Sequence, residues 1–140
     1  MSDYFRFMER NLTLPTDREV WESDIAQYWF EGGVLIASNK DVYRTLENIT
    51  SAISMINEIT RGKKVPLLIL SPFEPEGDVD ALDYLYAHLD KYISAIGLIE
   101  ASFFKRIQSN YDIKSEDDAL KTRVFKNQTT ALKWLRKFEE

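Results

Sequence analysis

Hydrophobic and polar positions follow two different spacings along this chain, and the spacings predict its strands and helices. Short apolar runs bounded by polar residues or glycine predict strands, whereas apolar residues three and four positions apart predict helices. The strands are expected at residues 25–30, 34–37, 65–70, 94–99 and 122–125. The helices are expected after Asp41, after Asp78 as N-cap, at 102–107, and after Asn127 as N-cap. The predicted order is β-β-α-β-α-β-α-β-α.

Two segments carry most of this pattern. Val65–Leu70 is continuously apolar, which is typical of a central strand covered on both faces. Between Val42 and Ile59 the apolar residues fall on one face of a helix, which predicts an amphipathic helix with a solvated opposite face. We expect Asn39 or Asp41 to cap its start and Gly62 to adopt a left-handed conformation after its end.

The alternation of strands and helices predicts an α/β fold. The glycine pair at 32–33 favours a hairpin between the first two strands, and the crossovers favour parallel pairing of the later ones. We therefore expect a mixed sheet of about five strands flanked by about four helices. Residues 1–24 fit this pattern less well and are expected to be an extension packed on the core, with residues 25–140 as a single domain.

Composition excludes several classes of chemistry. The chain has 140 residues, a formal charge of -5 and a pI near 5.0, so a nucleic-acid partner is not expected. There is no cysteine, and His88 is the one histidine, which excludes disulfides, thiolate nucleophiles and metal sites built on paired histidines. No glycine-rich phosphate loop is present. We expect a protein that is not an enzyme, with no metal and no cofactor.

Membrane and export signals are also not expected. The start of the chain lacks a basic region followed by an apolar stretch, and the apolar runs are far shorter than the ~18 residues that span a membrane. The sequence predicts a cytoplasmic protein that does not span a membrane.

The sharpest charge feature is an acidic stretch between Ser71 and Asp90, which contains no lysine or arginine. It can serve a basic partner surface, hold a hard cation such as Mg²⁺ or Ca²⁺, or merely cap a helix and complement its dipole. The sequence favours the last interpretation. If the stretch binds a partner or ligand, the candidate surface consists of Ser71, Glu74, Glu76, Asp78, Asp80 and Asp83.

Charge is also unevenly divided along the chain. Residues 101–140 carry a net charge of +3, which leaves -8 on the first hundred. Opposite charges at two regions permit head-to-tail or symmetric self-association, so a homodimer is one candidate assembly. Phe103 and Phe104, with Lys105, Arg106 and Lys114 nearby, also permit binding to phospholipid headgroups.

The element order resembles the STAS superfamily, and more closely the uncharacterised SpoIIAA-like bacterial proteins, over residues 25–138. The resemblance is carried by the hairpin Tyr-Trp-Phe-Glu-Gly-Gly-Val-Leu at 28–35, Lys64–Leu70, Val124–Phe125 and Ala131–Leu135. It implies a mixed sheet flanked by helices and a protein-interaction role, best known in anti-sigma-factor antagonists regulated by phosphorylation of a serine that opens the second helix. Here that position reads Asp78-Val79-Asp80-Ala81, without a hydroxyl, and Ser71 is the nearest serine.

Two functions lead from the sequence, and a metal-dependent enzyme that uses carboxylates between Glu74 and Asp83 is a third possibility. The first is a non-catalytic STAS-like regulatory domain that binds an unidentified protein partner through the surface around the second helix. The alternative is a small-ligand or lipid-binding domain with a crevice at the carboxyl ends of the strands, where open α/β sheets usually bind ligands.

Overall fold

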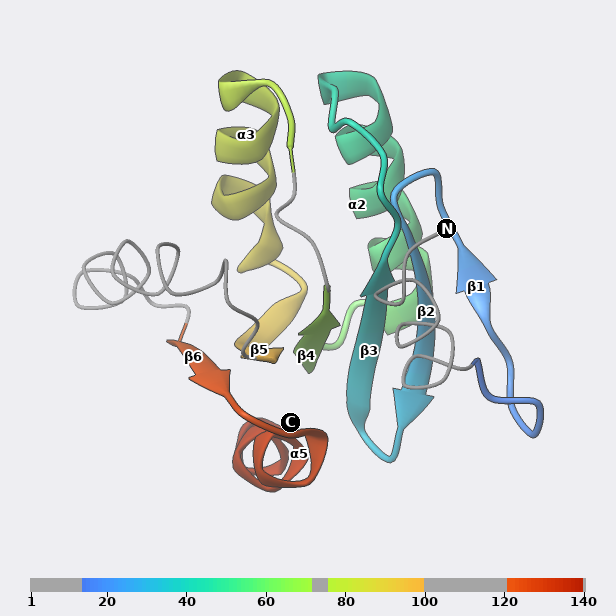
Figure 1. Ribbon diagram of the computed structural model, residues 1–140, viewed down its shortest axis with the longest axis vertical. Helices are drawn as coiled ribbons and strands as arrows, with labels where there is room; N and C mark the ends of the chain where they lie inside the picture. Colours follow the sequence, from blue (N-terminus) through green and yellow to red (C-terminus); the bar gives the residue numbers. More distant parts are fainter. Residues whose placement is uncertain (1–13, 72–75, 100–120, 140) are drawn as a thin grey trace, which may run out of the picture.

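The structure is a computed structural model, which describes residues 14–71, 76–99 and 121–139 as a mixed sheet with helices on both faces (Figure 1). The strands are β1 (Trp21–Glu22), β2 (Ala26–Glu31), β3 (Val34–Asn39), β4 (Val65–Leu70), β5 (Ile93–Ile99) and β6 (Lys121–Phe125). The described helices are α2 (Leu46–Thr60), α3 (Val79–Leu89) and α5 (Gln128–Leu135), and α5 continues into a 3₁₀ turn, η1 (Arg136–Phe138). The predicted α/β class with a mixed sheet is confirmed.

The six strands lie in the sheet in the order in which they occur in the sequence. β1, β2 and β3 pair antiparallel, and β3 to β6 pair parallel. The sheet has one strand more than expected because Trp21 and Glu22 pair with Tyr28 and Gln27, and a two-residue strand has no periodicity to detect. The helix expected at 102–107 lies outside the described residues.

The connections explain which face each helix covers. The crossovers through α2 and α3 both step in the same direction along the sheet, from β3 to β4 and from β4 to β5. Right-handed crossovers that step in one direction place their helices on one face. Accordingly, α2 and α3 share one apolar cluster, whereas α5, which follows the last strand, packs in a second cluster with Ala131 and Leu135 buried.

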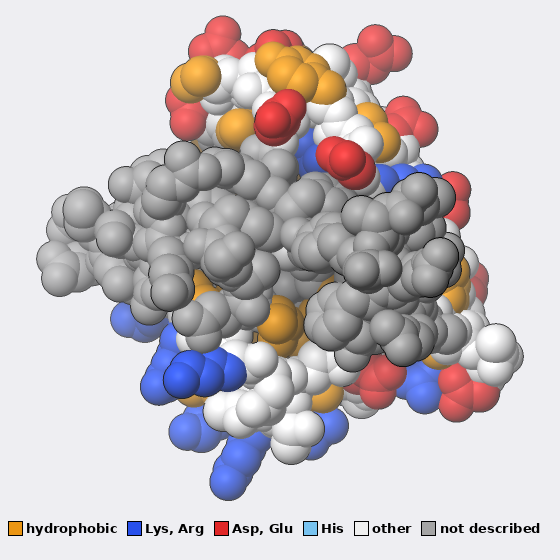
Figure 2. All heavy atoms as spheres, in the orientation of Figure 1, with side chains coloured by type: hydrophobic (Ala, Val, Ile, Leu, Met, Phe, Trp, Pro, Cys, Tyr) orange, Lys and Arg blue, Asp and Glu red, His pale blue; other side chains and the backbone are white. Residues whose placement is uncertain are grey.

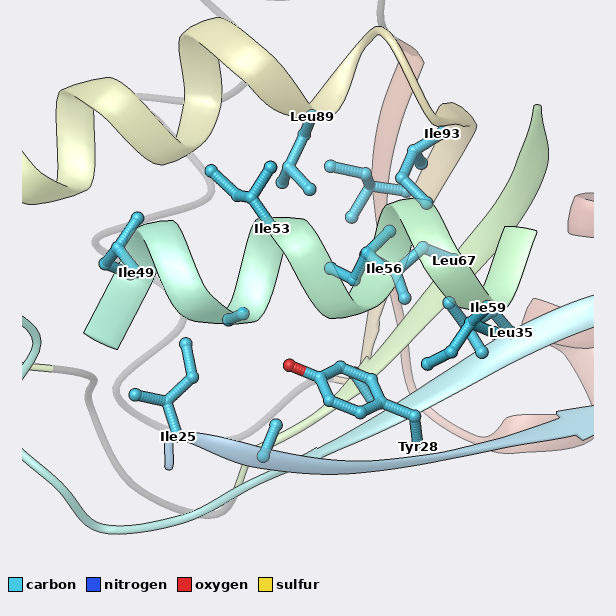
Figure 3. Packing of buried hydrophobic residues seen from close by; sticks show 14 of the residues in the cluster. Ile25, Tyr28, Leu35, Ile49, Ile53, Ile56, Ile59, Leu67, Leu89 and Ile93 are labelled. Carbon is cyan, nitrogen blue, oxygen red and sulfur yellow. The ribbon is translucent and has the colours of Figure 1, made fainter. Parts of the chain in front are cut away.

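The larger cluster is built mainly from isoleucines of α2. Ile49, Ile53, Ile56 and Ile59 point between the sheet and α3, and Tyr28 of β2 lies beneath them (Figure 3). Burial of each of these side chains contributes roughly 1.5–3 kcal/mol before the entropy cost of ordering it. The helical spacing read from the sequence therefore identifies the buried face of α2 from Ile49 onward.

The start of α2 differs from its prediction. Neither Asn39 nor Asp41 caps the helix: Thr45 is the N-cap, its hydroxyl accepts a hydrogen bond from the backbone N–H of Asn48, and the Asn48 side chain accepts one from the N–H of Thr45. Of the four residues before Thr45, Tyr43 and Arg44 contact a second loop. Gly62 has φ 79° after the helix, as expected.

The other two predicted helix starts are correct in position. Asn127 caps α5 by accepting a hydrogen bond from the backbone N–H of Thr130 at 2.9 Å. Asp78 occupies the N-cap position of α3, but its side chain makes no capping hydrogen bond. The carboxylate of Asp78 is used elsewhere, and this difference leads to the candidate site.

Candidate functional site

Two loops meet at the carboxyl end of the parallel strands. The first joins β3 to α2, and the second leads from β4 into α3. The backbone N–H of Arg44 donates to the carbonyl of Glu76 at 2.8 Å, and the N–H of Asp78 donates to the carbonyl of Arg44 at 2.9 Å. These two bonds form a parallel bridge between Arg44 and Gly77. The helices α2 and α3 therefore begin from one connected backbone unit.

The backbones of the two loops lie so close at this bridge that only glycine fits at position 77. A Cβ at this position would lie 2.5 Å from the Cβ of Arg44 and 2.7 Å from its carbonyl oxygen. Both are parts of the neighbouring backbone or directly attached to it, so neither can swing aside. Only glycine allows the two loops to approach this far.

The Arg44 side chain fixes the first loop from inside. It is 3% exposed, and its guanidinium donates to the carbonyls of Lys40, Val42 and Ile25. Burial lowers the pKa of Arg44, against a smaller opposing effect of Asp41 and two tyrosines. A buried guanidinium bonded to backbone carbonyls positions the loop, because its planar fork reaches several acceptors at once.

A second contact joins the loops at the surface. The hydroxyl of Tyr43 donates to the carboxylate of Asp78 at 2.8 Å. This hydrogen bond and the negative charge of Asp78 raise the pKa of Tyr43. Asp78 thus holds the aromatic ring of the neighbouring loop in place of capping its own helix.

These contacts present large apolar side chains to solvent. We call this group the apolar patch; it consists of Val42 (38% exposed), Tyr43 (53%), Leu46 (51%) and Val79 (73%). Figure 2 shows hydrophobic and acidic side chains together at the top of the view, where α2 and α3 begin. Exposed apolar side chains that are grouped and surrounded by polar ones are typical of interaction sites.

The apolar spacing had placed two of these residues, Val42 and Leu46, on the buried face of a helix. Val42 and Leu46 have the right spacing for α2, but the helix begins four residues later than expected, so both lie at or before its first turn. Val79 is the first residue of α3 and points away from the core. The spacing alone contains no signal for this exposure, since it depends on where each helix begins. Arg44 and Tyr43 were also missed.

The predicted acidic residues surround this patch only in part. Glu76, Asp78, Asp80 and Asp83 are exposed in the segment that opens α3. Ser71 is 5% exposed at the end of β4 and does not contribute to the outer surface. Glu74 lies outside the described residues. We call the exposed carboxylates around the apolar patch the acidic rim; it consists of Asp41, Glu47, Glu76, Asp78, Asp80 and Asp83.

A shallow depression of about 690 Å³ continues from the patch along the outer side of α2. Its lining residues come from this helix alone: Leu46, Glu47, Thr50, Ser51, Ser54, Met55 and Glu58. Leu46 belongs to both features, so the depression begins at the patch and follows the helix past Met55. The sequence predicted this face as solvated and polar, and Leu46 and Met55 were not recognised as part of it.

Other kinds of site find less support in the part of the chain that the structure describes. No three His, Asp or Glu side chains gather there as a metal site would require. No helix in the described ranges is both long and apolar enough to cross a bilayer. The order of the six strands never reverses, and a reversal is where open α/β sheets usually bind ligands.

Comparison with known proteins identifies a family but no characterised relative. No curated protein and no solved structure matches the chain. Residues 28–139 match the model of the family described as "Domain of unknown function (DUF7793)". Because this match covers most of the chain, the protein belongs to that family.

Proposed function

We propose that this protein is a non-catalytic, STAS-like interaction domain that binds another protein through the apolar patch and the acidic rim. The observation that carries the proposal is the fixed exposure of Leu46, Tyr43 and Val79 around the bridge between Arg44 and Gly77. A rigid apolar surface loses little conformational entropy on binding, because its backbone is already ordered. Apolar anchors with a polar rim are the usual arrangement of a protein interface.

The geometry of the loops favours a protein over a small ligand. A ligand crevice at the strand ends would separate the loops after β3 and β4, whereas here two backbone hydrogen bonds join them. The apolar side chains point outward from this junction. A surface of this kind is complementary to another macromolecular surface, and a small molecule would stay largely exposed on it.

The resemblance to STAS domains supports the same region. In those proteins the regulatory serine opens the second helix, which corresponds to the start of α3 here. Aspartates occupy this position, and Ser71 is buried at the end of β4. We infer that the negative charge at this end is permanent. An aspartate supplies neither the full charge nor the three acceptor oxygens of a phosphate, so it does not imitate a phosphorylated state.

Affinity purification of the tagged full chain from its native host, followed by mass spectrometry, tests the proposal. Wild type should retain a stoichiometric protein partner. Val79→Ser and the double variant Asp80→Asn/Asp83→Asn should lose most of it, because one removes an apolar anchor and the other removes charge from the rim. Both changes are at exposed positions, so the thermal unfolding midpoint should stay close to that of wild type.

Glu19→Gln is the matched control. Glu19 is exposed beside Arg18, which donates to the carbonyl of Phe30 near the β2–β3 hairpin, at the opposite end of β3 from the patch. This variant should retain the partner at the wild-type level. Retention of the same partners in equal amounts by all four proteins would contradict the proposal.

A further inference from the structure

The described residues carry opposite charge at two separate regions of the molecule. The acidic rim lies at the carboxyl end of the parallel strands. Residues 121–139, which form β6, α5 and η1, contain one carboxylate, Glu139, and a larger set of cations that we call the basic end. The basic end consists of Lys121, Arg123, Lys126, Lys133, Arg136 and Lys137, all of them exposed.

Figure 2 shows the separation directly. Acidic side chains gather at the top, where α2 and α3 begin, and basic side chains gather at the bottom and lower left, over β6 and α5. Three further exposed lysines precede the parallel strands at their amino ends: Lys63, Lys64 and Lys91. Exposed cations therefore lie at the amino ends of β4 and β5, whereas the acidic rim lies where α2 and α3 begin.

The basic end also offers apolar surface. Trp134 and Phe138 are half-buried, and their ring centroids lie 4.8 Å apart. The guanidinium of Arg123 lies 5.4 Å from the ring centroid of Phe125 and 6.0 Å from that of Trp134. Cations over aromatic rings form a surface that is complementary to exposed aliphatic and acidic side chains.

We propose that the acidic rim and apolar patch of one copy bind the basic end of a second copy, in a head-to-tail assembly. This inference rests on the interaction surface proposed above and names its occupant. The acidic rim and the basic end lie on opposite sides of the folded molecule and do not touch each other. They can therefore pair only between two copies of the chain. Such a contact uses different surfaces on the two partners and leaves one free end of each kind, so it extends into open chains or closes into a ring.

Sedimentation velocity of the purified full chain gives the first test. At low salt the mean mass should rise above that of the 16.4 kDa monomer as protein concentration increases. Raising the salt from about 0.05 M to about 0.5 M should reverse the association, because contacts between exposed charges are screened over a few ångströms at high ionic strength. A monomer at every concentration and salt would overturn the proposal.

Charge reversal at each end gives the decisive test. Asp80→Lys/Asp83→Lys disables the acidic rim, and Lys133→Glu/Lys137→Glu disables the basic end at two exposed positions one helical turn apart. Each variant alone should lose at least about tenfold in association constant, because each now opposes like charges across the contact. Glu19→Lys, a reversal away from both surfaces, should associate like wild type.

Mixing the two variants tests whether the acidic rim of one copy pairs with the basic end of another. Each retains the end that the other has lost, and the two reversed ends are also opposite in charge, so an equimolar mixture should regain the association that either variant alone lacks. A mixture that stays monomeric, or a single variant that still forms dimers, would overturn the proposal. If self-association fails while Val79→Ser still loses a different protein partner, the proposed function stands without this inference; if both fail, neither stands.

Discussion

The helices α2 and α3 begin at the same edge of the sheet, yet their first turns are stabilised in different ways. At α2, Thr45 and Asn48 satisfy each other's backbone N–H groups, which is a purely local arrangement. At α3, the Asp78 side chain leaves its helix uncapped and accepts the hydroxyl of Tyr43 from the neighbouring loop. The start of α2 is therefore fixed by two residues three positions apart. At the start of α3, the Asp78 side chain is hydrogen-bonded to Tyr43, which is 35 positions away in the sequence.

This difference has a functional meaning within the proposed interaction surface. A local cap would stabilise α3 but would leave Tyr43 without its hydrogen bond to Asp78. The contact that replaces the cap fixes an aromatic ring on the apolar patch. The following predictions test the contacts that join the two helix starts and the burial of Tyr86 in α3, in order of decreasing effect.

Arg44→Met should destabilise the protein most, by about 3 kcal/mol, because it leaves the carbonyls of Lys40 and Val42 without their guanidinium donor and removes a bond to the carbonyl of Ile25. The free energy of unfolding in urea measures this loss. Arg44→Lys should recover only part of it, since an ammonium cannot span the same acceptors. Lys63→Met, at an exposed position, is the control. A loss below about 1 kcal/mol for Arg44→Met would mean that water reaches these carbonyls.

Tyr86 of α3 should make the fold sensitive to alkali. Burial raises the pKa of Tyr86 to about 12, against a smaller lowering by Arg44. The folded state therefore favours the neutral phenol. Below the ordinary tyrosine pKa of about 10, this preference contributes fully to the free energy of unfolding. The contribution, roughly 2–3 kcal/mol, is lost as the pH rises from there through the pKa of Tyr86 in the folded state. Urea unfolding across this range should show a shallower decline for Tyr86→Phe than for wild type; equal slopes would contradict the assignment.

Gly77→Ala should cost about 2 kcal/mol, because the added Cβ meets the Cβ and carbonyl oxygen of Arg44, which cannot move without breaking the bridge. Gly97→Ala is the matched control in β5. Its Cβ would meet the ends of the Leu135 and Leu68 side chains at 3.0 and 3.2 Å, so these need to move by only a few tenths of an ångström and no backbone atom is in the way. Thermal or urea unfolding compares the two variants. An equal or larger loss for Gly97→Ala would show that the bridge is flexible.

Thr45→Ala should cost about 1 kcal/mol, as expected for the loss of a capping side chain. Asp78→Ala should cost less, at most about 0.5 kcal/mol, because its side chain caps nothing and its bond to Tyr43 is exposed. The difference between the two free energies of unfolding measures the contrast directly. Equal losses would mean that Asp78 caps α3 in solution.

The smallest effect should be on Tyr43 itself. Asp78→Asn should lower the pKa of Tyr43 toward its ordinary value, because the hydrogen bond to Asp78 is the largest cause that raises it, ahead of desolvation and the charge of Asp78. Glu76→Gln should lower this pKa less, since the charge of Glu76 is the weaker cause. An NMR titration of the tyrosine ring carbons separates the two variants. An unchanged pKa of Tyr43 in Asp78→Asn would show that the two loops are not joined at the surface.

The sequence by itself determined those elements whose signals are local. The apolar run of β4, the helical spacing of α3 and the Asn127 cap all specify their own segments, and the observed boundaries agree with them. It also identified the acidic residues that open α3, since charge can be counted without a structure.

Tertiary structure decided the features that depend on contact between distant segments. The bridge from Arg44 to Gly77 delays the start of α2, and this delay exposes Val42 and Leu46. Periodicity states which residues share a helical face, but it does not state where the helix begins when another loop competes for the same backbone hydrogen bonds. The burial of Ser71 likewise follows from its place at the end of a central strand. The apolar patch therefore exists only because two loops far apart in sequence satisfy each other's backbone groups.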